Sequence, residues 1–201
     1  MHRALIGTLV VVSLVGSPLR SQTHQPLPRW GVVAGFGVGR GSGDVTCGEC
    51  RGSQGGPSMH GRVGGALRED LYLVAELDGF SSSENRDPLA PPATSLLALD
   101  VVAQWYPQSA RGYFLSAGLG GGRVETNSTD PFEDTITSPI GWAFKVGTGY
   151  DIRVTRAFAV TPFASFVHVA SSAPKGFTQR MNGHVLLFGV EANLITRELL
   201  N

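Results

Sequence analysis

Two cysteines in a glycine-rich segment are the first residues whose spacing could support chemistry. Cys47-Gly48-Glu49-Cys50 has the CxxC spacing. A redox motif of this kind needs a helix that starts directly after a strand, as in thioredoxin-like units, and the sequence predicts no such helix here. A zinc site needs two further ligands, and His60 is the one nearby candidate. We therefore favour a disulfide in an exported loop over the redox and zinc interpretations.

We predict that Cys47 and Cys50 are oxidised in the exported protein, because an oxidising compartment preserves disulfides in exposed loops. Mass spectrometry should show that the non-reduced peptide is lighter than the reduced peptide by the mass of a pair of hydrogens. The ring closed by so short a loop constrains the unfolded chain weakly, so its loss should change global stability little. Thiols that react with an alkylating agent would contradict the prediction.

Two clusters of glycines have the composition of a nucleotide-binding loop without its context. Gly118, Gly120, Gly121 and Gly122 precede Arg123, do not complete a GxGxxG motif, and are followed by no predicted helix. The other cluster, Gly35, Gly37, Gly39 and Gly41, alternates along a strand, as glycines do where two backbones approach closely. We therefore assign no catalytic, cofactor-binding or metal residues, and expect neither enzymatic activity nor a cofactor.

The composition is that of one domain with little charge. The chain has 201 residues, 16 basic and 16 acidic, so no net field favours a nucleic-acid partner. Charged residues make up 16%, against about 25% in soluble domains. Glycine, at 27 residues, is well above its usual share of about 7%. These values suit a sheet that has lipid on one side and a crowded interior on the other.

The first 21 residues have the pattern of an export signal. His2 and Arg3 form a basic start, Ala4–Val15 an apolar stretch, and Gly16–Ser21 a segment of mostly small residues. The apolar stretch is shorter than the roughly 20 residues that a membrane-spanning helix needs. We expect residues 1–21 to be a signal peptide and residues 22–201 to form one barrel domain.

Eight strands are predicted in the mature chain, each near the roughly 10 residues of a tilted membrane strand. They cover Arg29–Gly39, Ser58–Arg68, Leu71–Phe80, Ser95–Tyr106, Gly112–Arg123, Pro139–Ile152, Ala157–Val169 and Gly183–Ile195. The connections between them alternate between long and short, as in outer-membrane barrels with long extracellular loops and short periplasmic turns.

Within these strands, alternate positions carry bulky apolar side chains, and the positions between them carry glycine, small or polar residues. We predict that the apolar positions face lipid and that the polar ones face the lumen, where buried charges must pair. The expected lumen network consists of Arg62, Arg68, Glu76, Asp78, Asp100, Gln104, Lys145 and Glu191. Aromatic residues expected at the membrane interface are Trp30, Tyr72, Trp105, Tyr106, Tyr113 and Phe114.

The predicted fold is all-β, an eight-stranded antiparallel up-and-down transmembrane β-barrel. The stretches GYFLSAGLGGG, GWAFKVGTGYDI, AVTPFASF and LFGVEANLI resemble small eight-stranded bacterial outer-membrane barrels built like the membrane domain of outer-membrane protein A. The resemblance implies location in the cell outer membrane and contact with outer-membrane lipid and lipopolysaccharide. It also implies insertion by the barrel-assembly machinery, and a monomer with a structural or surface-interaction role.

Three alternatives remain open. Lipid A deacylases resemble this chain in fold and carry a His-x-Ser pair with a downstream acid. Here the spacing is His168-x-x-Ser171, which puts the two side chains on opposite faces of a strand, and Glu191 lies on the lumen parity. A porin-like pore for small solutes is the second alternative. A soluble lipocalin-like barrel is the third, and it would place the apolar positions inside.

Overall fold

The computed structural model describes residues 31–46, 53–82, 93–108, 111–126, 136–174 and 180–196, and these residues are almost entirely β-structure. The strands are β1 Val32–Thr46, β2 Ser53–Arg68, β3 Leu71–Ser81, β4 Thr94–Trp105, β5 Tyr113–Thr126, β6 Ile136–Thr137, β7 Gly141–Tyr150, β8 Ile152–Arg153, β9 Phe158–Ala170 and β10 Asn182–Thr196. Across these described ranges, no helix is both long enough and apolar enough to cross a membrane.

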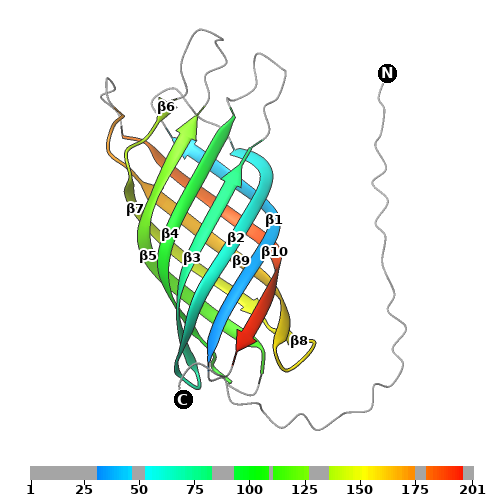
Figure 1. Ribbon diagram of the computed structural model, residues 1–201. Helices are drawn as coiled ribbons and strands as arrows, with labels where there is room; N and C mark the ends of the chain where they lie inside the picture. The colour runs from blue at the N-terminus through cyan, green and yellow to red at the C-terminus, as the bar shows by residue number, and fades with distance from the viewer. Residues whose placement is uncertain are drawn as a thin grey trace, which may run out of the picture.

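The strands form one closed antiparallel ladder (Figure 1). Each long strand pairs with the next one along the chain, in the order β1, β2, β3, β4, β5, β7, β9 and β10. The last strand then pairs with the first, from Val32 opposite Thr196 to Thr46 opposite Asn182. Eight long strands thus close an up-and-down barrel, and an interior of this size is just wide enough for side chains to fill.

The predicted strands are confirmed, with differences in extent. β5 continues past the predicted Arg123 to Thr126, and its end pairs with the short β6. β1 continues to Thr46, and β2 begins at Ser53. Both strands therefore extend into a segment that the sequence predicted as a loop. The ladder between β1 and β10 continues to Thr46, and the ladder between β1 and β2 continues to Ser53, so this segment has strand partners. Pairing with neighbours outweighs local β-propensity here. The predicted sixth strand is divided into β7 and β8 by Asp151.

The two faces of the sheet have the inverted polarity that the sequence predicted. Large apolar side chains point outward and are exposed, for example Phe36 at 62% and Leu119 at 69%. Charged side chains such as Lys145 and Glu191 point inward and are almost completely buried. A soluble barrel would have the opposite arrangement, so the exterior is suited to hydrocarbon and the interior to a polar network.

Inward-facing glycines make room for this network. A side chain at Gly35 would collide with the carboxylate of Glu191 and the amide of Asn193. A side chain at Gly120 would meet the backbone of β4 and the carboxylate of Asp100. Glycine is therefore required at these two positions, because neighbouring lumen side chains and backbone lie too close for a Cβ atom.

Above and below the polar network, the lumen is filled by two apolar layers. The layer at the long-connection end consists of Val45, Phe80, Leu96, Ala98, Val124, Ala143, Val167, Val169, Met181, Val185 and Leu187, with Phe163 packed against it. The layer at the short-turn end consists of Val33, Tyr72, Val74, Val102, Tyr106 and Phe114. The interior thus has three layers, whereas the sequence predicted only the polar one.

The short-turn layer corrects the prediction for three aromatic residues. Trp105 and Tyr113 are exposed on the outside, as expected of residues at the membrane interface. Tyr72, Tyr106 and Phe114 are instead buried in the lumen, where the Tyr106 ring lies 5.6 Å from that of Tyr72 and 5.4 Å from that of Phe114. These three residues alternate with outward-facing residues of their strands and therefore face the lumen. The prediction was based only on their closeness to the ends of the strands. Trp30 lies outside the described residues.

Candidate functional site

The candidate site is the polar middle layer of the lumen, and one half of it is centred on Lys145 of β7. Its Nζ lies 2.7 Å from Glu76 Oε2 and 2.7 Å from Asp78 Oδ2, both on β3. Asp78 Oδ1 also contacts His60 Nδ1 of β2 at 2.9 Å. β4 and β5 separate β3 from β7, so the lysine joins parts of the barrel wall that are not neighbours in the ladder.

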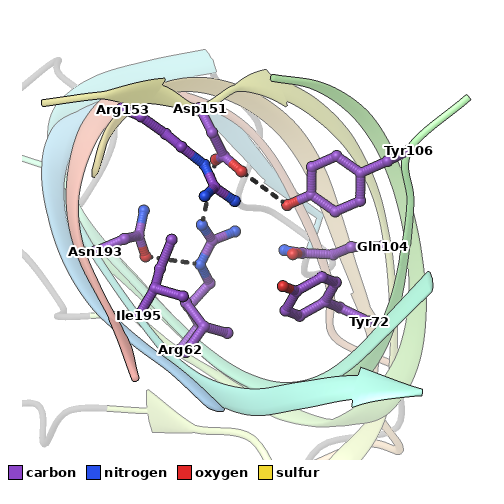
Figure 2. A pocket seen from close by; sticks show the side chains of 9 residues that line it. Arg62, Tyr72, Gln104, Tyr106, Asp151, Arg153, Asn193 and Ile195 are labelled. Atoms are coloured by element: carbon purple, nitrogen blue, oxygen red, sulfur yellow. Dashed lines mark hydrogen bonds and ion pairs between the residues drawn. The ribbon is translucent and has the colours of Figure 1, made fainter. Parts of the chain in front are cut away.

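The other half is centred on Arg62 of β2, which points toward β10 (Figure 2). Its Nε lies 3.0 Å from Glu191 Oε1 and donates to Asn193 Oδ1 at 3.0 Å. Its terminal nitrogen lies 3.8 Å from Asp151 Oδ1. The guanidinium is also 5.6 Å from the centre of the Phe114 ring, within reach of a cation–π contact.

Further side chains contribute hydrogen bonds and contacts to both halves. Gln104 donates to Glu76 at 2.8 Å, and His60 Nε2 lies 3.8 Å from Glu191 Oε2, so His60 lies between the two halves. At the short-turn end, Asp151 accepts from Tyr106 at 3.0 Å and from Thr161 at 2.8 Å. Buried ions need such additional hydrogen bonds, because their mutual attraction alone does not offset desolvation.

Seven of the eight residues predicted for the lumen are found there, and Arg68 is not. Arg62, Glu76, Asp78, Asp100, Gln104, Lys145 and Glu191 are all buried in the interior. The Arg68 side chain is 73% exposed at the β2–β3 turn and pairs with Asp70 at 3.3 Å. The register shifts between Ala66 and Arg68, and this irregularity changes the face on which Arg68 lies.

Asp100 lies in the lumen but does not join the paired network that the sequence predicted. Its side chain is buried, and neither carboxylate oxygen has a hydrogen-bond partner. Its register partner on β3 is the acidic Glu76, and its partner on β5 is Gly120, which has no side chain to offer. Pairing across a lumen depends on which strands face each other, so alternation alone could not show this.

The sequence prediction also omitted His60, Asp151 and Asn193 from the network. His60 shares the parity of Arg62, and Asn193 that of Glu191, so alternation could have revealed both. Asp151 lies between β7 and β8, where the strand is interrupted, and alternation gives no guide there. Its side chain is buried in the lumen, where it accepts hydrogen bonds from Tyr106 and Thr161.

Three buried residues of the network carry side chains of the kinds that bind metal ions. Ligand atoms of His60, Glu76 and Asp78 lie within 4.8 Å of one another, close enough to share an ion. The ammonium of Lys145 already contacts both carboxylates, and it occupies the position between them that an ion would take. The chain thus supplies its own cation at this place.

Two small cavities lie beside the network, each of about 10 Å³. One is lined by Arg62, Tyr72, Gln104, Tyr106 and Asp151, among others, and is the pocket drawn in Figure 2. The second lies beside His60, Glu76 and Lys145. A volume of this size holds about one water molecule, so neither cavity is large enough for an organic solute.

His168 does not form a catalytic pair with Ser171. The imidazole lies on the outer face, with its centre 5.6 Å from the Trp142 ring and 6.0 Å from the Phe144 ring. The Ser171 side chain is buried and donates to the carbonyl of Pro139 at 2.6 Å. The opposite placement inferred from their spacing is confirmed. Cys47 and Cys50 lie outside the described residues, so their disulfide stays a prediction.

A closed antiparallel ladder, an apolar exterior and a filled polar interior define an eight-stranded transmembrane β-barrel. Among solved structures, the chain is similar to Neisserial surface protein A, with 13% identity, a TM-score of 0.59, and coverage of 82% of this chain and 97% of that one. It is also similar to Ail, the attachment invasion locus protein of Yersinia pestis, with 9% identity, a TM-score of 0.57, and coverage of 82% and 99%. At these identities the likeness shows the fold alone. No protein-family model matches the chain, and no curated protein does.

Proposed function

We propose that this protein is a monomeric outer-membrane barrel with a structural or surface-interaction role, and that its lumen neither conducts nor catalyses. The observation that carries the proposal is the filled lumen, with an apolar layer on each side of the Arg62 and Lys145 ion pairs. A sealed interior leaves the outer wall and the long connections as the surfaces available for function.

Location in the outer membrane is part of the proposal. It is supported by the apolar exterior, by the signal-like residues 1–21, and by the outer-membrane barrel fold. Export through a signal peptide and insertion by the barrel-assembly machinery would follow. The similar structures are named a surface protein and an attachment invasion locus protein, and a surface role here would agree with those names.

Cell fractionation tests the location directly. We expect the protein in the outer-membrane fraction, and we expect its migration on a gel to change when the sample is boiled, because a closed barrel resists detergent until it is heated. A soluble protein whose migration does not depend on heating would contradict the proposal.

A sealed lumen predicts no steady, large conductance in planar bilayers. The reason is that the cavities beside the network have room for about one water each, so ions have no continuous aqueous path. A large open porin, measured in the same bilayers, provides the positive control.

A resolved channel in the unmutated protein would support the pore alternative instead. Such a channel should also respond to Glu76→Gln, because this carboxylate lies in the middle of the lumen. A signal that does not change with this substitution would come from a contaminating porin.

A further inference from the structure

Two histidines and an aspartate lie side by side on the outer wall of the barrel. His184 of β10 is the Cα partner of Asp44 on β1 and also of His168 on β9. The three residues therefore form one row across three adjacent strands, with His184 in the middle. We call Asp44, His184 and His168 the histidine row. Neither the lumen network nor the proposed function uses it.

All three side chains of the histidine row point outward, close to the rim of the barrel. Their chain neighbours Val45, Val167 and Val185 are buried in the apolar layer of the lumen, and successive side chains of a strand face opposite sides. The three residues themselves are partly exposed. Each lies two residues from the long-connection end of its strand, so dissolved ions can reach the row from outside.

The polar atoms of the histidine row have few partners within the protein. In the part of the chain that the structure describes, the imidazoles of His168 and His184 make ring contacts but no hydrogen bond or ion pair. Asp44 Oδ1 is shielded from solvent and has no hydrogen-bond partner. An unsatisfied oxygen of this kind in a native structure calls for an explanation, and an absent ion or its ligand is one.

No basic side chain of the flanking rows competes for a cation here. On β1, β10 and β9, the flanking rows carry no charge and consist of Thr46, Asn182 and Ala170 on one side and Ser42, Leu186 and Phe166 on the other. The buried carboxylates of the lumen differ, because the ammonium of Lys145 contacts them. The histidine row thus has ligands for a cation and no cation of its own.

We infer that the histidine row binds a divalent transition-metal ion, with His168 and His184 as ligands and Asp44 as the acceptor for the second ring nitrogen of His184. Directly opposed residues of an antiparallel pair have Cβ atoms about 4.5–5.5 Å apart, and two imidazoles can reach one ion from that separation. A carboxylate that accepts from the other ring nitrogen is the usual companion of a metal-bound histidine. Imidazole ligands suit Zn²⁺, Cu²⁺ and Ni²⁺, whereas Mg²⁺ and Ca²⁺ prefer oxygen.

Binding requires both imidazoles to turn toward each other. The His168 ring centre lies 5.6 Å from that of Trp142 and 6.0 Å from that of Phe144. The His184 ring centre lies 6.1 Å from that of Phe166. Exposed side chains change rotamer rapidly, so these ring contacts can be exchanged for metal ligation without a change in the backbone.

Calorimetric titration of the full chain in detergent micelles with ZnCl₂ tests the inference. We expect saturable binding that an excess of MgCl₂ does not prevent, and ¹⁵N spectra of histidine-labelled protein should show ring-nitrogen shifts for His168 and His184. His168→Gln and His184→Gln should each prevent saturation at the zinc concentrations that saturate the unmutated protein. Asp44→Asn keeps both ligands and should weaken binding by about 10–100-fold, the usual effect of losing such a carboxylate.

His24→Gln is the matched control, because it removes one histidine that is not part of the row. This variant should bind Zn²⁺ as the unmutated protein does. Heat-dependent gel migration shows which variants are folded, and the ¹⁵N shifts of the unmutated protein keep the test decisive if a variant does not fold.

Three results would overturn the inference: equal zinc binding by His168→Gln, His184→Gln and the unmutated protein, equal competition by Mg²⁺, or loss of binding when Cys47 and Cys50 are both replaced by serine. The last would assign the zinc to the two cysteines. The histidine row lies outside the lumen and zinc is titrated in micelles, so failure of this test leaves the sealed lumen and the outer-membrane location to their own experiments.

Discussion

Lys145→Met should lower the free energy of unfolding by about 3–5 kcal/mol, the usual cost of removing one partner from a buried ion pair. The loss belongs at the upper end of this range, because the ammonium contacts both Glu76 and Asp78 at 2.7 Å. Methionine fills a similar volume, so the effect reports the two carboxylates left unpaired. Equilibrium unfolding in urea, with the barrel in lipid vesicles, measures the change.

Two further variants separate charge pairing from packing. Asp100→Asn removes a lumen carboxylate whose oxygens have no hydrogen-bond partner, so stability should stay the same or rise. The triple variant Lys145→Met, Glu76→Gln, Asp78→Asn should recover much of the loss, because it also removes the two carboxylates that Lys145 paired. A Lys145→Met protein as stable as the unmutated one would mean that the network contributes little.

Leu119→Arg should destabilise the barrel by about 2–4 kcal/mol, as a basic residue does on the lipid face near the bilayer midplane. Leu119 lies near the middle of β5, and its neighbours on β4 and β7 are Val101 and Phe144. The arginine would have to bring water or bend toward the interface to keep its charge hydrated. The same urea titration in vesicles measures this change.

Leu119→Phe is the matched control, because it keeps an apolar side chain against the hydrocarbon. It should unfold at nearly the same urea concentration as the unmutated protein. If arginine were tolerated at this position as well as phenylalanine, the outer wall would not face lipid.

Alternation of residue types predicted most of the fold. A period of two assigns Lys145 and Glu191 to the interior and Leu119 and Val101 to the exterior, and the structure agrees. The prediction was wrong where the period is broken. Arg68 follows a register shift in β2, which no feature of composition reveals. Asp151 interrupts a strand and so escaped the pattern.

Pairing across the lumen could not be predicted in the same way. Alternation places Asp100 and Lys145 inside, but the partners that meet depend on how far the strands are offset around the barrel. That offset is set by all eight ladders together, so it is not encoded in any one segment. The sequence therefore placed seven of its eight predicted residues in the lumen correctly, but wrongly expected Asp100 to be paired.

The closure of the ladder has a consequence for the order of assembly. Arg62 is on the second strand of the chain, and its carboxylate and amide partners Glu191 and Asn193 are on the last. Until β10 docks against β1, that guanidinium has no counter-charge from β10, and both sheet edges are open to other chains. Contacts between residues so far apart in sequence form slowly. The docking of β10 against β1 therefore satisfies the backbone hydrogen bonds of both sheet edges and pairs Arg62 with Glu191 in the same step. A chain that lacks β10 would lose the closing ladder and this ion pair together.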